Sequence, residues 1–247
     1  MHVHTDASDG VSSVLDVLAR AQNAELDVLA ITDHNTIENA LLAQSLSANY
    51  GLEVVVGEEI STRQGHLLAL FIKEAIPPGL SLSDTIQRVH GQNGLAIIPH
   101  PYDYISFGVL NPWRRGLNRA KLLAMDFDAI EVFNGCIIGL QPNRKAEELA
   151  TTARSACVCG SDAHIASAVG TSYTSFRGRT AEALRMAIID KSTVPHGHHW
   201  SLQHYLGVMR RRELRYARVA ASHAVSLCSA AGLVAALNLR SGIARLF

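Results

Sequence analysis

The sequence lacks several features that would assign it to a common class of protein. Its 22 basic residues are balanced by 22 acidic ones, so the formal net charge is +0, which argues against a strong electrostatic attraction for duplex nucleic acid. Its four cysteines form no Cys-x-x-Cys pair, which predicts reduced thiols in a cytoplasmic protein. The first twenty residues carry histidine and aspartate in place of an apolar core, so we expect no signal peptide.

Short apolar runs that alternate with helical patterns predict the secondary structure. Strands are expected near residues 26–32, 52–57, 66–72, 95–98, 128–133 and 156–159, and helices near 13–23, 36–49, 83–92, 119–126, 143–153 and 180–190. About seven strand-like runs with helices between them are typical of a parallel α/β barrel, whose active site lies beyond the carboxyl ends of the strands. An open doubly wound sheet is the alternative, but it requires a glycine-rich phosphate loop after its first strand, and residues 2–6 contain no glycine.

Side chains that bind divalent metals lie at the ends of these runs. They are His2, His4, Asp9, Asp33, His34, Glu58, Glu59, His66, His100, Asp162 and His164. Because parallel strands bring the residues that follow them to one edge of the sheet, we expect most of these side chains to share one site. Imidazole and carboxylate are ligands that suit zinc, manganese and iron.

The last part of the chain, residues 195–247, is expected to form a C-terminal helical extension to a domain of residues 1–194. Its histidines are interpreted as a solvated loop, with a second metal site as the alternative; they are His196, His198, His199 and His204. No charged residue occurs from 219 to 239, so a membrane span is considered. The many alanines and polar residues in this stretch favour a packed helix instead, and a basic helix lying on a membrane or a partner is a third interpretation.

The short motifs of the chain resemble those of the PHP family, which is named for polymerase and histidinol phosphatase. They are His-Val-His-Thr at 2–5, Ser-Asp-Gly at 8–10, Ile-Thr-Asp-His-Asn-Thr at 31–36, Gly-Glu-Glu-Ile-Ser at 57–61, Gly-His at 65–66, Ile-Pro-His-Pro at 98–101, Ala-Ile-Glu-Val-Phe-Asn-Gly at 129–135, Gly-Ser-Asp-Ala-His at 160–164 and Val-Gly at 169–170. These motifs occur in the order of that family and cover about residues 1–190. The resemblance implies an α/β fold, a distorted (β/α)7 barrel similar to a TIM barrel.

The resemblance also implies a cluster of three divalent metal ions, which would be manganese, zinc, iron or magnesium. The implied ligand sets are His2, His4, Glu59 and Asp162 for the first ion, Glu59 as a bridge with His66 and His100 for the second, and Asp9, His34 and His164 for the third. Glu59 is chosen over Glu58 because it precedes the apolar residue and the serine of its motif. Asp33 is expected to orient His34 or its neighbours from behind the ligands.

Two features depart from the family pattern. Members usually have an apolar strand directly before the first His-x-His, whereas only Met1 precedes it here, so either translation starts further upstream or the first strand is short. Basic side chains often follow the Asn-Gly at 134–135 in the family, but Cys136 follows it in this chain. Phosphate recognition is therefore assigned to Arg63, Arg144 or Lys145.

The activity that the resemblance implies is hydrolysis of phosphate esters by a metal-dependent phosphoesterase. A metal-bound hydroxide would attack phosphorus with the help of Asp162, and His100 or His164 would protonate the leaving group. The expected substrates are nucleotide phosphomonoesters such as 3′,5′-bisphosphonucleotides, or the 5′ ends of short oligonucleotides. Histidinol phosphate is the alternative substrate, and a non-catalytic metal-binding module is the alternative role.

Overall fold

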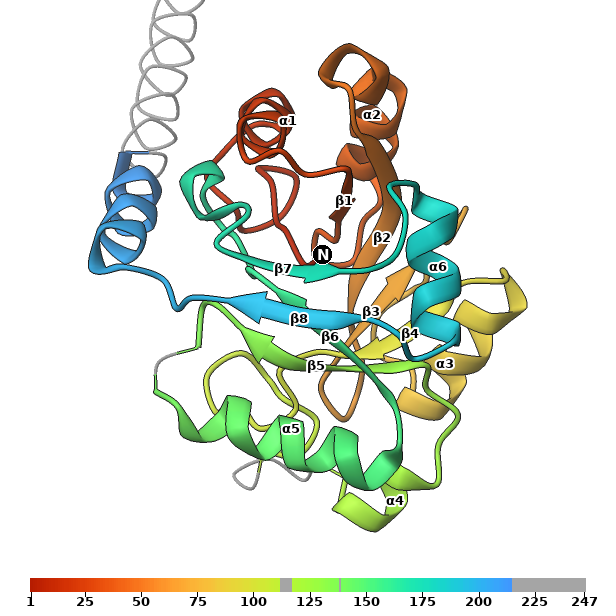
Figure 1. Ribbon diagram of the computed structural model, residues 1–247. Helices are drawn as coiled ribbons and strands as arrows, with labels where there is room; N and C mark the ends of the chain where they lie inside the picture. Colours follow the sequence, from red (N-terminus) through yellow and green to blue (C-terminus); the bar gives the residue numbers. More distant parts are fainter. Residues whose placement is uncertain (112–116, 138, 215–247) are drawn as a thin grey trace, which may run out of the picture. The chain divides into compact units, whose positions relative to one another are not determined.

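The computed structural model describes residues 1–111, 117–137 and 139–214 (Figure 1). The chain divides into two units, Met1–Tyr205 and Leu206–Phe247, and the strands described below belong to the first. The described residues of the second unit, 206–214, are helical. The stretch 219–239 that was considered as a membrane span lies outside the described residues. Within the described part, no helix has the length and apolar character needed to cross a bilayer.

Six strands form one curled sheet in which each strand lies beside the next in sequence. They are β1 (Val28–Ile31), β2 (Glu53–Ser61), β3 (His66–Leu70), β4 (Leu95–Ile98), β5 (Ala129–Asn134) and β6 (Ala156–Gly160). The expected α/β fold with a TIM-like, curled sheet is confirmed. Parallel pairing throughout is not, because β3 runs antiparallel to both β2 and β4. The reason is that residues 62–65 alone connect β2 to β3, whereas a parallel crossover needs about a dozen residues.

Helices lie around the outside of the sheet (Figure 1). They are α1 (Val14–Asn23), α2 (Glu38–Leu46), α3 (Leu82–Gly91), α4 (Arg119–Leu123), α5 (Gln141–Ala153) and α6 (Ala181–Ile189), with short 3-10 turns η1 (Ser47–Tyr50) and η2 (Ala166–Ala168). The Ser13 side chain accepts a hydrogen bond from the Asp16 N–H, and the Asp16 carboxylate accepts one from the Ser13 N–H. This capping box fixes where α1 begins and turns its apolar face, including the fully buried Val17 and Leu18, inward.

The N-terminal segment lies between the two edge strands of the sheet. Val3 forms a single parallel bridge to Ala163, which follows β6, and the Val3 carbonyl accepts a hydrogen bond of 2.9 Å from the N–H of Thr32, which follows β1. Strand pairing within residues 1–5 is limited to this bridge. The bridge therefore places His2 and His4, on either side of Val3, where the edges of the sheet approach each other.

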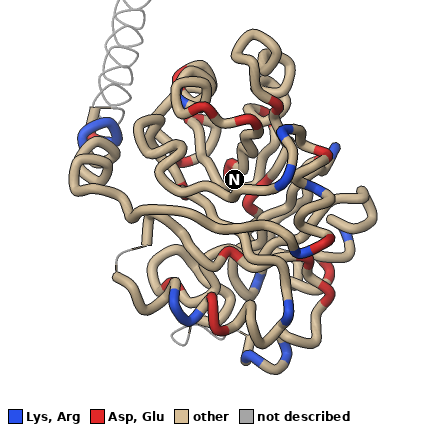
Figure 2. Tube along the Cα trace, viewed as in Figure 1, with Lys and Arg blue, Asp and Glu red and all other residues tan. Residues whose placement is uncertain are grey.

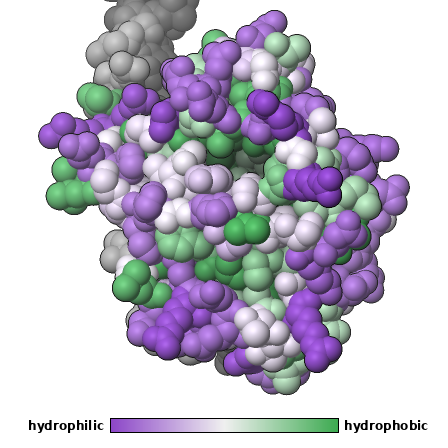
Figure 3. Space-filling view, in the orientation of Figure 1, coloured by the Kyte–Doolittle hydropathy of each residue, from purple (hydrophilic) through white to green (hydrophobic). Residues whose placement is uncertain are grey.

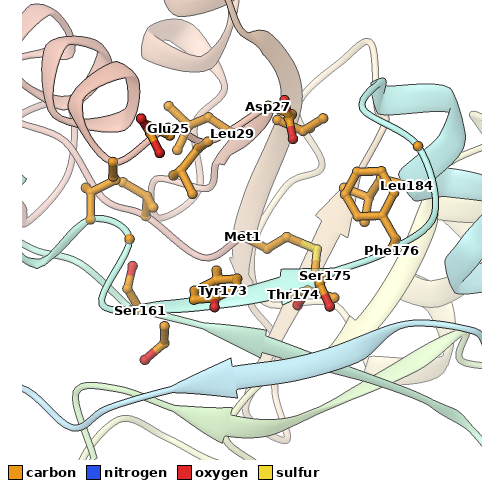
Figure 4. A pocket seen from close by; sticks show the side chains of 18 residues that line it. Met1, Glu25, Asp27, Leu29, Ser161, Tyr173, Thr174, Ser175, Phe176 and Leu184 are labelled. Carbon is orange, nitrogen blue, oxygen red and sulfur yellow. The ribbon is translucent and has the colours of Figure 1, made fainter.

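A cavity of about 400 Å³ lies beside this bridge. The residues that line it include Met1, Leu29 of β1 and Thr174 of β7 (Ser172–Ser175) (Figure 4). On the face shown in Figure 3, hydrophobic residues lie at the bottom of the hollow in this region. None of the expected metal ligands lines the cavity, so it is separate from the site described below.

A second, two-stranded sheet pairs β7 with β8 (Val194–Gly197) in antiparallel fashion and contacts β6. Neither strand was predicted, because both are short and carry polar or half-exposed residues. This pairing includes residues 194–197 in the first unit, so the domain boundary predicted after residue 194 lies earlier than the division after Tyr205. The three cysteines among the described residues are free thiols, and Cys228 lies outside them.

Candidate metal centre

The nine expected metal ligands lie together at one end of the curled sheet. His2, His4 and Asp9 come from the N-terminal segment, His34 follows β1, Glu59 lies on β2, His66 begins β3, His100 follows β4, and Asp162 and His164 follow β6. Figure 2 shows Asp and Glu in the interior around the N-terminus, whereas Lys and Arg lie mainly on the outer helices and loops. The reversal of β3 contributes to this clustering, because it brings the start of β3 to the same end as the carboxyl ends of β2 and β4.

Four side-chain atoms form a compact group between β2 and the segment after β6. The Nε2 atoms of His2 and His4 lie 3.2 and 3.1 Å from Oε2 of Glu59. The same two atoms lie 3.4 and 3.2 Å from Oδ1 of Asp162. A metal ion bound at about 2.0–2.2 Å by four tetrahedral ligands holds those ligands roughly 3.3–3.6 Å apart. The four nitrogen–oxygen distances, 3.1–3.4 Å, lie near or just below the lower end of this range.

Two further groups lie beside the first. Oε1 of Glu59 lies 2.8 Å from Nδ1 of His66 and 3.0 Å from Nε2 of His100. In a more exposed group, Oδ2 of Asp9 lies 3.0 Å from Nε2 of His164, and Oδ1 of Asp9 lies 3.8 Å from Nε2 of His34. His34 and His100 also approach members of the other groups. The structure thus brings all nine residues of the implied sets together but groups them differently. The groups whose ligand atoms all lie within 4.8 Å of one another are His4, Asp9, His34 and His164; His2, His100 and Asp162; His2, His4 and Glu59; and His34, Glu59 and His66.

Several buried ring nitrogens in this cluster make no well-aligned hydrogen bond among the described residues, although Nε2 of His4 and Nδ1 of His66 lie 3.1 and 2.8 Å from oxygens of Glu59. They are both ring nitrogens of His4 and the Nδ1 atoms of His34, His66 and His100. A buried polar atom that is left unsatisfied costs about 1–3 kcal/mol, so a folded protein tolerates several in one place only where something else binds them. Imidazole nitrogens beside carboxylates are the donors that zinc, manganese and iron accept. The residues present therefore fit divalent metal ions.

The buried carboxylates control the protonation of the cluster. Burial alone would lower the pKa of His4, but Asp162 and Glu59 outweigh burial and raise this pKa to about 10. Burial alone would raise the pKa of Glu59 and of Asp162, but the surrounding histidines hold both well below their usual range. In His34, burial dominates and lowers the pKa to about 4. At neutral pH, therefore, Glu59 and Asp162 are ionised, His4 is protonated and His34 is neutral in the metal-free cluster.

We expect divalent-metal affinity to rise with pH and metal binding to release protons. A metal ion needs a neutral imidazole, so it must displace the proton that His4 holds below a pKa of about 10. Between about pH 6 and 8, affinity should rise by up to about tenfold per pH unit for each proton displaced. Calorimetric titration with Mn²⁺ in two buffers of different ionisation enthalpy measures this release. An affinity that stays constant over this range would contradict the protonation described here.

Two residues of β5 that sequence analysis left without a role connect the ligands to one another. Oε1 of Glu131 accepts a hydrogen bond of 3.0 Å from Nδ1 of His2, and Oε2 accepts from the His100 N–H at 3.0 Å and from Nδ2 of Asn134 at 2.9 Å. Nδ2 of Asn134 also lies 3.1 Å from Oδ2 of Asp162. Glu131 is only 1% exposed. A lone carboxylate within an apolar strand is the signal in the sequence that could have identified Glu131, although it does not name His2 as its partner.

Two acidic residues next to expected ligands hydrogen-bond to other partners. The Asp33 carboxylate accepts hydrogen bonds from the N–H and hydroxyl of Thr5 and from the hydroxyl of Ser8. It therefore holds the N-terminal loop between His4 and Asp9. Oε2 of Glu58 accepts a 2.8 Å hydrogen bond from the Ile76 N–H, and burial raises the pKa of Glu58 to about 7.

The three basic residues expected to bind phosphate lie on the exterior. Arg63 is exposed in the β2–β3 turn, and Arg144 pairs with a glutamate one turn further along α5 at 3.6 Å. Nζ of Lys145 lies 5.9 Å from the ring centre of Tyr102, in the loop that follows His100. Substrate binding by any of them stays a prediction. Within the described residues, no group with metal-ligand spacing includes His196, His198, His199 or His204.

Two protein families match parts of this chain. Residues 1–164 match the PHP domain family, and residues 141–193 match a family described as PHP-associated. An uncharacterized protein of Methanocaldococcus jannaschii is 35% identical over 165 residues, which are 60% of this chain and 91% of that protein. A 5′-3′ exoribonuclease of Haemophilus influenzae is 30% identical over 115 residues, which are 42% of each chain.

A solved structure has a similar fold. It is a two-domain protein of Bacteroides vulgatus, described as containing a predicted PHP-like metal-dependent phosphoesterase. The TM-score is 0.66 at 18% sequence identity, and the match covers 80% of this chain and 63% of the other. At this identity the likeness shows the fold alone.

Proposed function

The chain belongs to the PHP domain family and is a hydrolase of the metal-dependent phosphoesterase type, and we propose that it hydrolyses phosphomonoesters of small nucleotides or the 5′ ends of short oligonucleotides. The observation that carries this proposal is the convergence of nine imidazole and carboxylate ligands around Glu59 at one end of the sheet. A structural role would not require so many ligands in one place. This argues against the alternative of a non-catalytic module.

In the proposed mechanism, each of three groups of ligands would hold one divalent ion. The groups are His2, His4, Glu59 and Asp162; Glu59, His66 and His100; and Asp9, His34 and His164. Bound divalent ions make a nucleophile available at neutral pH by lowering the pKa of water, and they neutralise charge on a phosphoryl group. Asp162, at the centre of the first group, keeps the Nε2 atoms of His2 and His4 directed at one point. Glu131, behind His2, fixes the orientation of that ring.

Substrate would reach the cluster from the side of Asp9, His34 and His164. Their side chains are 45%, 24% and 14% exposed, whereas those of His2, His4 and His100 are at most 1% exposed. His164 is closer to the opening than His100, and it can give a proton to the leaving oxygen of an incoming ester only when its Nε2 atom is not bound to an ion of the third group. The 2.9 Å contact from Nδ1 of His164 to the Asp162 carbonyl leaves the Nε2 side of the ring facing Asp9 and the opening.

The size and charge of the protein favour a small substrate. With a formal net charge of +0 and its Lys and Arg spread over the outer helices and loops (Figure 2), the protein offers no strong overall electrostatic attraction for a long duplex. The exoribonuclease relative matches over 42% of its length. A nucleotide or a short strand therefore suits this site, and histidinol phosphate is the alternative small substrate.

Phosphate release from a small panel of esters tests this proposal. The panel holds a 3′,5′-bisphosphonucleotide, a 5′-mononucleotide, histidinol phosphate and a short 5′-phosphorylated RNA, each assayed with Mn²⁺ and with excess chelator. We expect release from at least one nucleotide or from the RNA, and no release with chelator. Release from histidinol phosphate alone would establish the alternative substrate. No release by metal-loaded protein from any member would refute the proposed activity.

A further inference from the structure

The loop that follows His100 exposes apolar side chains at the edge of the metal centre. Tyr104, Ile105 and Phe107 are 39%, 75% and 42% exposed. The ring centre of Phe107 lies 5.5 Å from that of His66, which is one of the expected ligands. The Phe107 carbonyl also accepts a 3.1 Å hydrogen bond from the His66 N–H. The Phe107 ring therefore directly contacts a residue of the metal centre.

The backbone of this loop is held in place although its side chains are exposed. The Asp103 carboxylate accepts hydrogen bonds from the N–H groups of Ile105 and Ser106, and the Asp103 carbonyl accepts from the Gly108 N–H. Close packing leaves room only for glycine at the loop's contact points. A Cβ at Gly108 would lie 2.5 Å from the His100 carbonyl oxygen, and one at Gly65 would lie 2.6 Å from the Phe107 carbonyl oxygen. The loop is thus a preorganised support for the Phe107 ring.

The backbone of Phe107 itself adopts a conformation that its residue type disfavours. Its φ is +59°, in the left-handed region where a bulky residue is rare and costs free energy. Glycine would adopt the same conformation at less cost. A strained, half-exposed aromatic ring on a rigid loop beside ligands is an arrangement that binding sites use.

We propose that Phe107 stacks on the base of a nucleotide whose phosphate is held at the metal centre. This inference rests on the proposed function and narrows its substrate class to esters that carry a nucleobase. Every nucleobase presents a flat π-face, and stacking on an aromatic side chain tolerates different bases. The enzyme is therefore selective for nucleotides over base-free sugar phosphates, with little preference among the four bases.

The test compares AMP with ribose 5-phosphate as substrates of the metal-loaded protein. Phe107→Ala should raise the KM for AMP at least about fivefold, because base–aromatic stacking contributes about 1–3 kcal/mol. Because the ring also contacts His66, any change in kcat or in the KM for ribose 5-phosphate measures that contact, and the rise in the KM for AMP should exceed it at least about fivefold. Phe107→Trp should retain the wild-type KM. Ile105→Ala is the matched control, since Ile105 is more exposed in the same loop, and it should change nothing.

The possible outcomes separate this inference from the proposed function. An equal loss for both substrates, or an unchanged KM for AMP in Phe107→Ala, overturns the stacking role while the phosphoesterase stands. Efficient hydrolysis of ribose 5-phosphate but not of AMP also overturns it. Calorimetric titration of AMP into metal-loaded wild-type protein and into Phe107→Ala compares their affinities for AMP without turnover. If the protein hydrolyses no substrate but binds AMP more tightly than Phe107→Ala does, the stacking role is supported and the proposed activity is refuted.

Discussion

Glu59→Gln is expected to lose nearly all phosphoesterase activity and most of its bound metal. The two carboxylate oxygens of Glu59 lie 2.8–3.4 Å from nitrogens of five histidines, His2, His4, His34, His66 and His100. An amide presents one neutral acceptor and one donor, so it can neither bridge two ions nor balance their charge. Losing several kcal/mol of transition-state stabilisation lowers kcat/KM by about 10³-fold or more. Metal analysis and phosphate release on the same preparation measure both effects.

The adjacent residue supplies a matched control for this prediction. Glu58 is also fully buried on β2, but it accepts a hydrogen bond from the Ile76 N–H, and burial raises its pKa to about 7. Glu58→Gln keeps this acceptor and removes a carboxylate that is costly to ionise, so metal content and activity should stay close to wild type. If Glu59→Gln retained metal and activity, or if Glu58→Gln lost them equally, the assignment of Glu59 as the central ligand would be wrong.

Glu131→Gln is expected to weaken metal binding about 10–100-fold, although Glu131 is not itself an expected ligand. Its Oε2 accepts two hydrogen bonds, so glutamine must keep its oxygen there and direct its NH₂ group at Nδ1 of His2. Nδ1 must then accept a hydrogen bond, which places the ring proton on Nε2, the atom that faces Glu59 and Asp162. A protonated Nε2 cannot bind a metal ion. Titration with Mn²⁺ at fixed pH measures the loss.

Asp128→Asn is the control for the Glu131 prediction. The Asp128 carboxylate contacts Nε2 of His90 at 2.9 Å and accepts a hydrogen bond from the Ala96 N–H, near the start of β4. It is thus another histidine–carboxylate pair, but one on residues outside the metal-ligand groups. Asp128→Asn should leave Mn²⁺ affinity unchanged. Equal affinity in wild type and Glu131→Gln would show that Glu131 does not control the His2 tautomer.

The location of the site could be predicted from the sequence because strand ends in a parallel sheet converge. His34 and His100 each follow a predicted strand, and both lie in the cluster. The choice between Glu58 and Glu59 also follows from strand geometry. Successive strand residues point to opposite sides of the sheet, so only one of the two carboxylates, that of Glu59, points toward the histidines. The short β2–β3 connection also contained the information needed to predict the reversal of β3.

Other features depend on contacts between residues far apart in the chain. Glu131 meets His2 across 129 positions, and no local pattern marks that pair. The Asp33 carboxylate accepts hydrogen bonds from Thr5 and Ser8 because the N-terminal segment lies against the end of β1. That segment forms only a single-residue bridge, at Val3, so the sequence contains no strand pattern from which this contact could be predicted. β7 and β8 were missed for a different reason. Their residues pair with each other and pack on β6, so tertiary packing and not local propensity makes them strands.

The metal content of the purified protein is the most direct test of a shared metal centre. Wild-type protein would be loaded with Mn²⁺, freed of excess ion by gel filtration and analysed by plasma mass spectrometry beside Asp162→Asn. The three ligand groups around Glu59 predict close to three ions per chain in the wild type and fewer in the variant. Fewer than one ion per chain in folded wild-type protein, or equal content in both proteins, would contradict this account.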